Sequence, residues 1–235
     1  SARRTTSGEC KSGVARCLVR CFSQRFFAWS VQTIPANTRC ELPFQGIEIS
    51  EYSIQNIVGT ANLGVELDLP RLAGELEGAK YDPVSFPGLV LRLTNPKTAI
   101  LMFRSGKLVC TGSKNLEQLD QSIRKVVARM RKLGFPVNEN PDVTVQNTVA
   151  SGDLGQEISL QAAVISLGLD RVEYEPEQFP GLVYRMDGPK VVVLLFASGR
   201  FVCTGARTIG DVGAAVAKLE EILRSLGLME QPPSA

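Results

Sequence analysis

The sequence predicts an α+β protein in which two tandem, pseudo-symmetric repeats build one ten-stranded antiparallel sheet with helices on one face. The first observation is an internal repeat, because residues 86–112 and 179–205 are identical at 16 of 27 positions at an offset of 93. A fixed-offset repeat of this quality indicates two copies of one structural unit. The second observation is that strand and helix patterns recur in the same order in both copies. Pseudo-two-fold symmetry of this kind suits a two-fold ligand such as duplex nucleic acid.

Each copy shows the same series of elements. A strand opens it, at 47–60 in the first copy and at 142–151 in the second, and a short helix follows at 69–76 or 159–166. Four short strands come next, expected at 79–83, 88–94, 97–104 and 107–111, and in the second copy at 172–175, 181–187, 190–197 and 200–204. Gly- and Pro-containing turns separate them, as in an antiparallel meander.

A long amphipathic helix closes each copy, at 116–133 and at 209–226. Gly134 and Gly227 follow these helices in the position where glycine ends a helix. The chain therefore divides into a basic extension at 1–45, a first repeat at 46–140, a second repeat at 141–228 and a short tail at 229–235.

Composition is that of an ordinary globular protein, with 44% hydrophobic and 21% charged residues. The net charge of +2 is unevenly distributed, because residues 1–45 hold seven Lys and Arg against two Asp and Glu. The repeats and tail therefore carry a net charge of −3 and lack the bulk basic signature of a non-specific DNA binder. Any role in DNA binding must depend on where the charges lie.

Several enzyme classes are excluded by residues that the chain lacks. It has no histidine, which removes Ser-His and Cys-His nucleophile pairs and every His metal ligand. Its Ser-Gly-Lys turn lacks the spacing of a phosphate-binding loop. Cys110 and Cys203 occupy equivalent positions inside apolar strands, where we expect buried thiols. No enzymatic activity, cofactor or metal is predicted.

The extension at 1–45 belongs to neither repeat. Its cysteines, Cys10, Cys17, Cys21 and Cys40, have the spacing C-x6-C-x3-C-x18-C, which lacks the paired knuckles of a zinc site. The segment is consistent with a transit-like presequence, a basic tail that touches DNA, or translated upstream sequence. We expect a poorly ordered extension.

One face of the predicted sheet is left uncovered by the helices. Period-two alternation places an apolar set with one Asn per repeat on that face: Asn56, Val58, Leu101, Phe103, Val109 and Thr111, and in the second copy Asn147, Val149, Leu194, Phe196, Val202 and Thr204. Phe86 and Phe179 stand before the adjoining strands, and Arg92, Lys107, Arg185 and Arg200 lie along the margins. This face could pack against another layer, but the sequence holds no segment to form one. A large exposed apolar face is otherwise an interaction surface.

Short motifs in both repeats resemble the TATA-box-binding protein family. They are QNIV and QNTV at 55–58 and 146–149, FPGL and VCTG in both copies, and EPEQFPG at 175–181. The resemblance covers about 46–228 and is nearest to the archaeal branch. Thr148 departs from it conservatively, in place of the usual Ile. The resemblance implies a curved, saddle-shaped sheet with its helices on the convex face.

This family is itself the standard example of minor-groove kinking by apolar wedges. The resemblance implies that Phe86, Phe103, Phe179 and Phe196 insert between base steps, and that Asn56 and Asn147, assisted by Thr111 and Thr204, donate to base edges. It further implies apolar groove contacts from Val58, Leu101, Val109, Val149, Leu194 and Val202, and phosphate contacts from Arg92, Lys107, Arg185 and Arg200. Glu175 and Glu177 match the family's contact for transcription factor B.

The function implied is that of a general transcription initiation factor. It would bind the minor groove of A·T-rich (TATA) promoter DNA, kink it, and recruit transcription factor B and, indirectly, RNA polymerase. Its location would be the cytoplasm, with the nucleoid, in an archaeon, or the nucleus in a eukaryote. The alternative is a divergent saddle-fold paralogue that serves as a protein-interaction scaffold or a DNA-processing accessory domain. Retention of all four Phe and both Asn argues against that alternative.

Overall fold

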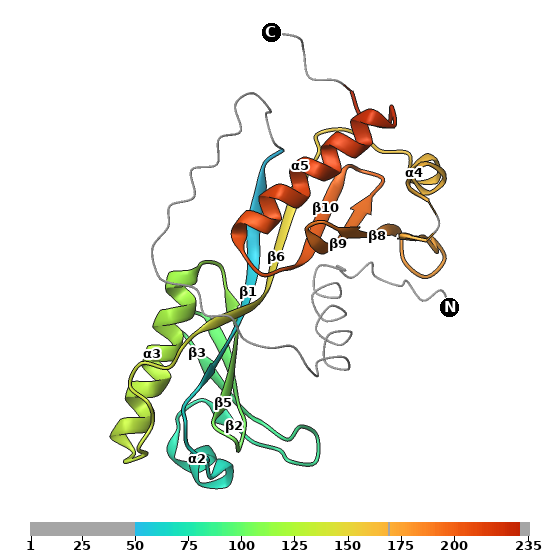
Figure 1. Ribbon diagram of the computed structural model, residues 1–235. Helices are drawn as coiled ribbons and strands as arrows, with labels where there is room; N and C mark the ends of the chain where they lie inside the picture. The colour runs from blue at the N-terminus through green and yellow to red at the C-terminus, as the bar shows by residue number, and fades with distance from the viewer. Residues whose placement is uncertain (1–49, 169, 231–235) are drawn as a thin grey trace, which may run out of the picture. The chain divides into compact units, whose positions relative to one another are not determined.

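The computed structural model describes residues 50–168 and 170–230, which lie within one compact unit. The basic extension and its four cysteines lie outside the described residues, as do residues 47–49 of the predicted first strand. Residues 50 and 51 are not in a strand, which begins at Tyr52 and therefore later than predicted. In the described part of the chain, ten strands form one antiparallel sheet in the order β2-β3-β4-β5-β1-β6-β10-β9-β8-β7 (Figure 1). The predicted α+β fold with two tandem copies in one sheet is confirmed.

The strands of the first repeat are β1 Tyr52–Asn62, β2 Ala79–Lys80, β3 Leu89–Leu93, β4 Thr98–Met102 and β5 Lys107–Ser113. Those of the second are β6 Thr144–Asp153, β7 Val172–Glu173, β8 Gly181–Asp187, β9 Lys190–Phe196 and β10 Arg200–Ala206. The helices are α2 Leu69–Glu75, α3 Leu116–Lys132, α4 Leu160–Leu167 and α5 Ile209–Ser225. Most bounds agree with the sequence-based ones to within one or two residues.

β2 and β7 are the main exceptions, being shorter than the predicted 79–83 and 172–175. After β2 the chain turns at Asp82, whose carboxylate accepts hydrogen bonds from the Ser85 hydroxyl and the Val84 N–H at 2.6 and 3.2 Å. These bonds lower the pKa of Asp82, the Ser85 hydroxyl having the larger effect. An Asp that binds its own following backbone favours a turn over a strand. Alternation alone does not reveal this local competition.

The two repeats meet where β1 pairs with β6 in the centre of the sheet. Asn56 lies opposite Val149 and Val58 opposite Asn147, with Ile57 and Thr148 between them. Because Asn56 and Asn147 are equivalent in the two copies, this register puts the pseudo-dyad between Ile57 and Thr148. Both are almost fully buried, at 0% and 1% exposure.

A side-chain cap precedes each of the four described helices. The oxygens of Asp68 and Asn115 accept the backbone N–H groups of Arg71 and Gln118. Ser159 caps α4 in the same way, and Thr208 forms a reciprocal capping box at α5. Each cap satisfies an N–H group that has no partner inside its helix.

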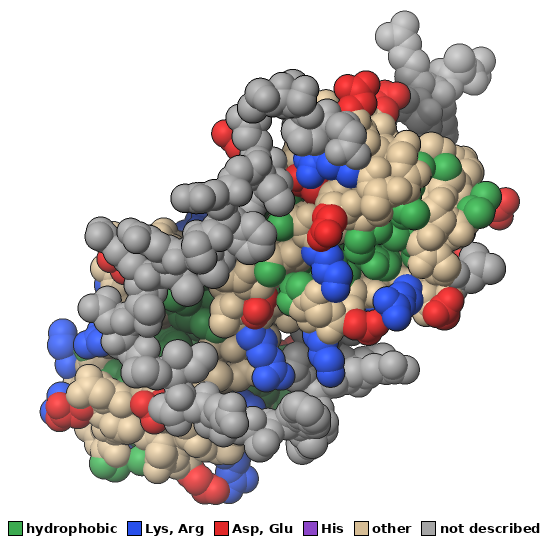
Figure 2. Space-filling model, turned by 45° about the horizontal axis from the view of Figure 1, so that its top comes forward, with side chains coloured by type: hydrophobic (Ala, Val, Ile, Leu, Met, Phe, Trp, Pro, Cys, Tyr) green, Lys and Arg blue, Asp and Glu red, His purple; other side chains and the backbone are tan. Residues whose placement is uncertain are grey.

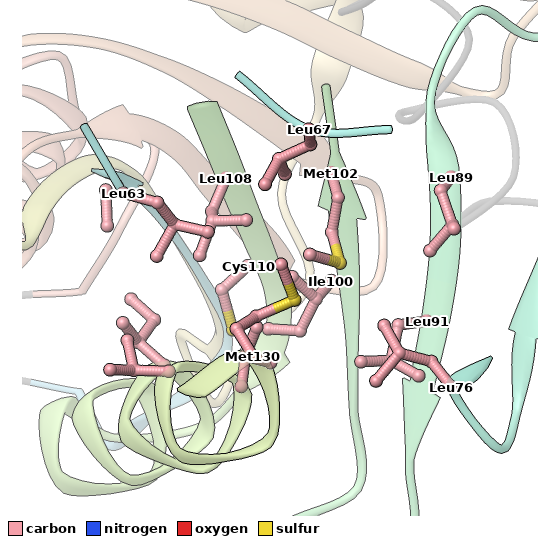
Figure 3. Close-up of a cluster of buried hydrophobic side chains, with 14 of the residues drawn as sticks. Leu63, Leu67, Leu76, Leu89, Leu91, Ile100, Met102, Leu108, Cys110 and Met130 are labelled. Atoms are coloured by element: carbon pink, nitrogen blue, oxygen red, sulfur yellow. The ribbon is translucent and has the colours of Figure 1, made fainter. Parts of the chain in front are cut away.

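The helices cover one face of the sheet and enclose one hydrophobic core per repeat. In the first, α3 packs on β5 and β1, and in the second, α5 packs on β10 and β6 (Figure 1). Figure 3 shows Met130 of α3 facing Cys110 and Ile100 of the sheet. A Cβ atom on Gly59 would lie 2.6 Å from a Leu119 methyl carbon, so glycine lets β1 approach α3 closely. None of the described helices is both long and apolar enough to cross a membrane.

Cys110 and Cys203 are fully buried free thiols at equivalent places in the two cores, as predicted. Burial raises the pKa of both, that of Cys203 to about 11. They therefore stay protonated at neutral pH and act as small core side chains.

One difference between the two cores is a pair of buried hydroxyl groups in the first. In the first, the Thr98 and Ser122 hydroxyls lie 2.9 Å apart, and Ser122 donates to the Gln118 carbonyl at 2.7 Å. The equivalent residues in the second repeat are Val191 and Ala215, so that core is apolar at the same place.

We predict that replacing the hydroxyl pair with its second-repeat equivalents shows strong coupling. Ser122→Ala alone should destabilise the protein by about 1–3 kcal/mol, because Thr98 keeps only a long contact to a carbonyl. Thr98→Val combined with Ser122→Ala should recover most of that loss, since both partners become apolar. Denaturant unfolding of the two single variants and the double variant measures the coupling. If the losses of stability in the two single variants added up to the loss in the double variant, the predicted coupling would be wrong.

Candidate nucleic-acid interface

The face of the sheet turned away from the helices, the open face, is a continuous apolar surface. Val90, Leu101 and Val109 lie side by side on β3, β4 and β5. Val183, Leu194 and Val202 repeat this row on β8, β9 and β10. All are half-buried except Leu194, which is 8% exposed, whereas their sequence neighbours on the other side of the strands are fully buried. The alternation predicted from the sequence is therefore present on both sides of the pseudo-dyad.

Figure 2 shows one side of the molecule, on which hydrophobic side chains reach the surface in patches with Lys, Arg, Asp and Glu around them. All four described helices contribute buried residues to the two cores, so none of them packs on the open face. The predicted face thus lacks a covering layer within the described residues.

The structure adds residues to this face that sequence reasoning missed. Register places Val90, Ala99, Val183 and Val192 on it. Extending the alternation through LVLRL at 89–93 and its second copy would have found Val90 and Val183. Gln55 and Gln146 stand at irregularities in the β1–β6 pairing, which period-two alternation does not detect. The amide of Gln55 donates to Ser53 and Ser151, and that of Gln146 to Thr60.

The two asparagines are held in one orientation by a glycine in the neighbouring strand. Oδ1 of Asn56 accepts the N–H of Gly112 at 2.7 Å, and Oδ1 of Asn147 accepts that of Gly205 at 2.7 Å. Both glycines lie where the strand register shifts, with φ of 95° and 99°. Such a bulge frees a backbone N–H from the ladder.

Since the amide oxygens are occupied, the NH₂ groups are what the asparagines offer to a ligand. Each also donates to a hydroxyl, Asn56 to Thr111 at 3.2 Å and Asn147 to Thr204 at 3.3 Å. An amide NH₂ carries two hydrogens, so one donor remains on each side chain. The centre of the open face therefore presents hydrogen-bond donors on an apolar background.

Two pairs of phenylalanines lie toward the ends of this face. The ring centroids of Phe86 and Phe103 are 5.8 Å apart at 65°, and those of Phe179 and Phe196 are 5.7 Å apart at 64°. Edge-to-face packing of this kind fixes each pair in nearly the same geometry. All four rings are half-buried, so part of each is available for contact.

Glycine in the FPG motif makes room for each pair. A Cβ atom on Gly88 would lie 2.6 Å from Cε1 of Phe86, and one on Gly181 would lie 2.7 Å from Cε1 of Phe179. Both positions are buried, and no other side chain fits against the rings without moving them. The motif that marks the repeat is thus the motif that seats the aromatic pair.

The four predicted margin cations all lie on the open face by register, but they are not equivalent. Arg185 forms an ion pair with Glu173 at 2.9 Å, and Arg200 approaches Asp153 at 3.6 Å. Arg92 and Lys107 have no carboxylate at ion-pair distance among residues 50–168 and 170–230.

Glu175 and Glu177 are exposed in the turn between β7 and β8, next to the second phenylalanine pair. The Glu175 carbonyl accepts the backbone N–H of Phe179 at 2.9 Å, which closes the turn. The first repeat has Asp82 and Val84 at the corresponding places, and Val84 is 95% exposed. Only the second turn therefore carries a pair of Glu side chains.

We predict that Gly88→Ala displaces the first phenylalanine pair and destabilises the protein by about 1–3 kcal/mol, the range typical of overpacking. Gly74→Ala is the matched control, because Gly74 lies in α2 with open space around it. That change should be neutral or should stabilise by about 0.5–1 kcal/mol. Thermal unfolding and proton chemical shifts of the Phe rings report both effects. Equal responses of the two variants would contradict the packing argument.

Comparisons with known proteins agree with this arrangement. The family model for "Transcription factor TFIID (or TATA-binding protein, TBP)" matches the chain twice, at residues 51–133 and 142–226. "TATA-box-binding protein E" of Halobacterium salinarum is 51% identical over 178 residues, covering 76% of this chain and 96% of the relative. "TATA-box-binding protein" of Archaeoglobus fulgidus is 49% identical over 176 residues, covering 75% and 96%.

Among solved structures, "Methanococcus jannaschii TBP" superposes with a TM-score of 0.68 at 46% identity, covering 74% of this chain and 99% of that one. The double match of the family model accounts for the internal repeat and for the two halves of the sheet. The family consists of DNA-binding transcription factors, which are not enzymes. This chain belongs to the TATA-binding protein family.

Proposed function

We propose that this protein is a general transcription initiation factor that binds the minor groove of A·T-rich promoter DNA with its open face and kinks the duplex. The observation that carries the proposal is the symmetric placement of two amide donors and two phenylalanine pairs on one apolar face. The names of the relatives support promoter DNA as the ligand.

The donors match the chemistry of A·T pairs. In the minor groove these pairs present only acceptors, adenine N3 and thymine O2, whereas a G·C pair adds the guanine amino donor. The NH₂ groups of Asn56 and Asn147 would donate to such acceptors at the centre of the site. A guanine amino group would meet another donor or the apolar valines, where it has no partner.

The phenylalanine pairs supply the deformation. Inserting them between base steps costs a few kcal/mol per step in lost stacking. Burial of the apolar face against a widened groove offsets this cost at roughly 25 cal/mol per Å². Because TA steps are the easiest to kink, sequence preference arises from deformability as well as from base contacts.

Partner recruitment completes the proposal. Glu175 and Glu177 form an exposed acidic turn on the second repeat and would bind transcription factor B, which in turn brings RNA polymerase. Arg92, Lys107, Arg185 and Arg200 would contact phosphates at the margins. Such a factor works where the genome lies, in the cytoplasm with the nucleoid in an archaeon or in the nucleus in a eukaryote. We propose residues 46–140 and 141–228 as the limits of the two repeats.

We predict that the full-length protein bends a short A·T-rich TATA duplex and that Phe179→Ala/Phe196→Ala removes most of this bending. End-to-end FRET on a labelled duplex measures it, with a G·C duplex as the sequence control. Leu116→Ala/Ile165→Ala is the matched control, because both side chains are exposed on helices and lie off the open face. It should bend DNA as the wild type does.

Unchanged FRET at saturating wild-type protein would overturn the proposal and favour the protein-interaction scaffold. If the Phe variant bent DNA fully, the wedge assignment would be wrong.

We also predict that Asn56→Asp weakens binding to the A·T duplex about 5- to 150-fold. The change removes the NH₂ donor and leaves a buried base acceptor without a partner, which costs about 1–3 kcal/mol. The carboxylate can still accept the Gly112 N–H, so the fold should persist. Asn140→Asp makes the same charge change on an exposed loop and should bind normally. Duplex titration by fluorescence anisotropy measures the affinity of both variants. An equal loss of affinity in both would mean that the effect comes from net charge and not from the lost donor.

A further inference from the structure

The margins of the open face differ between the repeats at two equivalent positions. Lys80 in the first repeat corresponds to Glu173 in the second, and Asn62 corresponds to Asp153. Lys80 pairs with Val90 and Glu173 with Val183, so both side chains share the open face with those valines. Asn62 pairs with Lys107, and Asp153 with Arg200, in the same way.

These two differences determine which Lys and Arg side chains of the margins have a carboxylate partner. In the second repeat Glu173 and Asp153 take up Arg185 and Arg200 in ion pairs. In the first repeat a lysine and an asparagine stand there instead, and no carboxylate of the described residues pairs with Lys80, Arg92 or Lys107. Among the described residues, Lys80, Arg92 and Lys107 of the first repeat therefore lack an ion pair, whereas Arg185 and Arg200, the counterparts of Arg92 and Lys107, are both paired with a carboxylate.

The net charges of the two repeats differ in the same sense as their margins. Residues 50–140 hold 12 Lys and Arg against 9 Asp and Glu, while residues 141–230 hold 7 against 12. The net charges are +3 and −5, so the long-range field adds to the difference at the margins. A polyanion that spans both repeats is therefore attracted more strongly by the first repeat than by the second.

We infer that the phosphate backbone of a bound duplex is gripped mainly by the first-repeat margin, through Lys80, Arg92 and Lys107, while the second repeat binds mainly through apolar and stacking contacts. This inference rests on the proposed function. The physical reason is that a carboxylate beside an arginine offsets its positive charge and repels an approaching phosphate, even though breaking such an exposed pair costs little. Each phosphate that is neutralised releases counterions, so the difference appears in the salt dependence of binding.

Exchanging the two margins tests the inference. Lys80→Glu/Asn62→Asp gives the first repeat the second repeat's residues, and Glu173→Lys/Asp153→Asn does the reverse. All four side chains are exposed, and Asn62 and Asp153 both accept the N–H of a glycine two residues later, so either residue suits either turn. Combining all four changes restores the wild-type net charge with the asymmetry reversed.

The readout is the slope of log affinity against log salt for full-length protein on the A·T duplex. Lys80→Glu/Asn62→Asp should make the slope shallower by about 2–3, at about 0.9 for each phosphate that is no longer neutralised. For three such phosphates, the change in affinity between 50 and 200 mM salt becomes about 40-fold smaller. Glu173→Lys/Asp153→Asn should steepen the slope by a similar amount, and the four-fold variant should return close to the wild type.

Lys132→Glu/Asn140→Asp controls for net charge, since it makes the same charge change at the far end of α3 and in the following loop. It should shift the slope by less than about 1, the change expected for a single phosphate. A slope unchanged in Lys80→Glu/Asn62→Asp, or shifted equally by this control, overturns the inference. Failure of wild-type protein to bend the duplex in FRET overturns the proposed function instead, so the two failures are distinguishable. Circular dichroism and thermal unfolding verify that each variant is folded.

Discussion

The antiparallel pairing of β1 with β6 is the contact on which the rest of this structure depends. It joins two similar five-stranded units into a single sheet and sets the pseudo-dyad between Ile57 and Thr148. Because directly opposed residues share a face, the same register puts Asn56, Val58 and their equivalents together at the centre of the open face. A shift of one residue would turn all of these side chains toward the cores.

Glycines convert this general architecture into a specific surface. Gly112 and Gly205 adopt a left-handed conformation in a strand bulge, and the N–H that each one frees fixes the amide of an asparagine. Gly88 and Gly181 leave the space in which each phenylalanine pair packs. A backbone N–H therefore orients each asparagine, and a glycine leaves room for each edge-to-face phenylalanine pair, so that one amide hydrogen and part of each ring stay available for a ligand.

The two repeats share one arrangement of strands and helices, but their side chains differ at places with different consequences. The hydroxyl pair of Thr98 and Ser122 lies inside one core and affects how that half packs. The differences at the margins lie on the surface and affect what that half attracts. The acidic turn at Glu175 and Glu177 marks the second repeat alone. A pseudo-symmetric frame can thus present two ends with distinct chemistry to one ligand or to different partners.

By itself the sequence determined the repeat, the order of elements, the glycines that end the two long helices and the alternation that separates core from open face, because each depends on local spacing along the chain. The family motifs identified the same residues, and the structure brings the Phe pairs and the asparagines onto one face. Only the tertiary structure decided the orientation of the asparagine amides, the places of Gln55 and Gln146, and the pairing of Arg185 and Arg200. These depend on bulges and on neighbours across strands that lie far apart in the sequence, which periodicity does not encode.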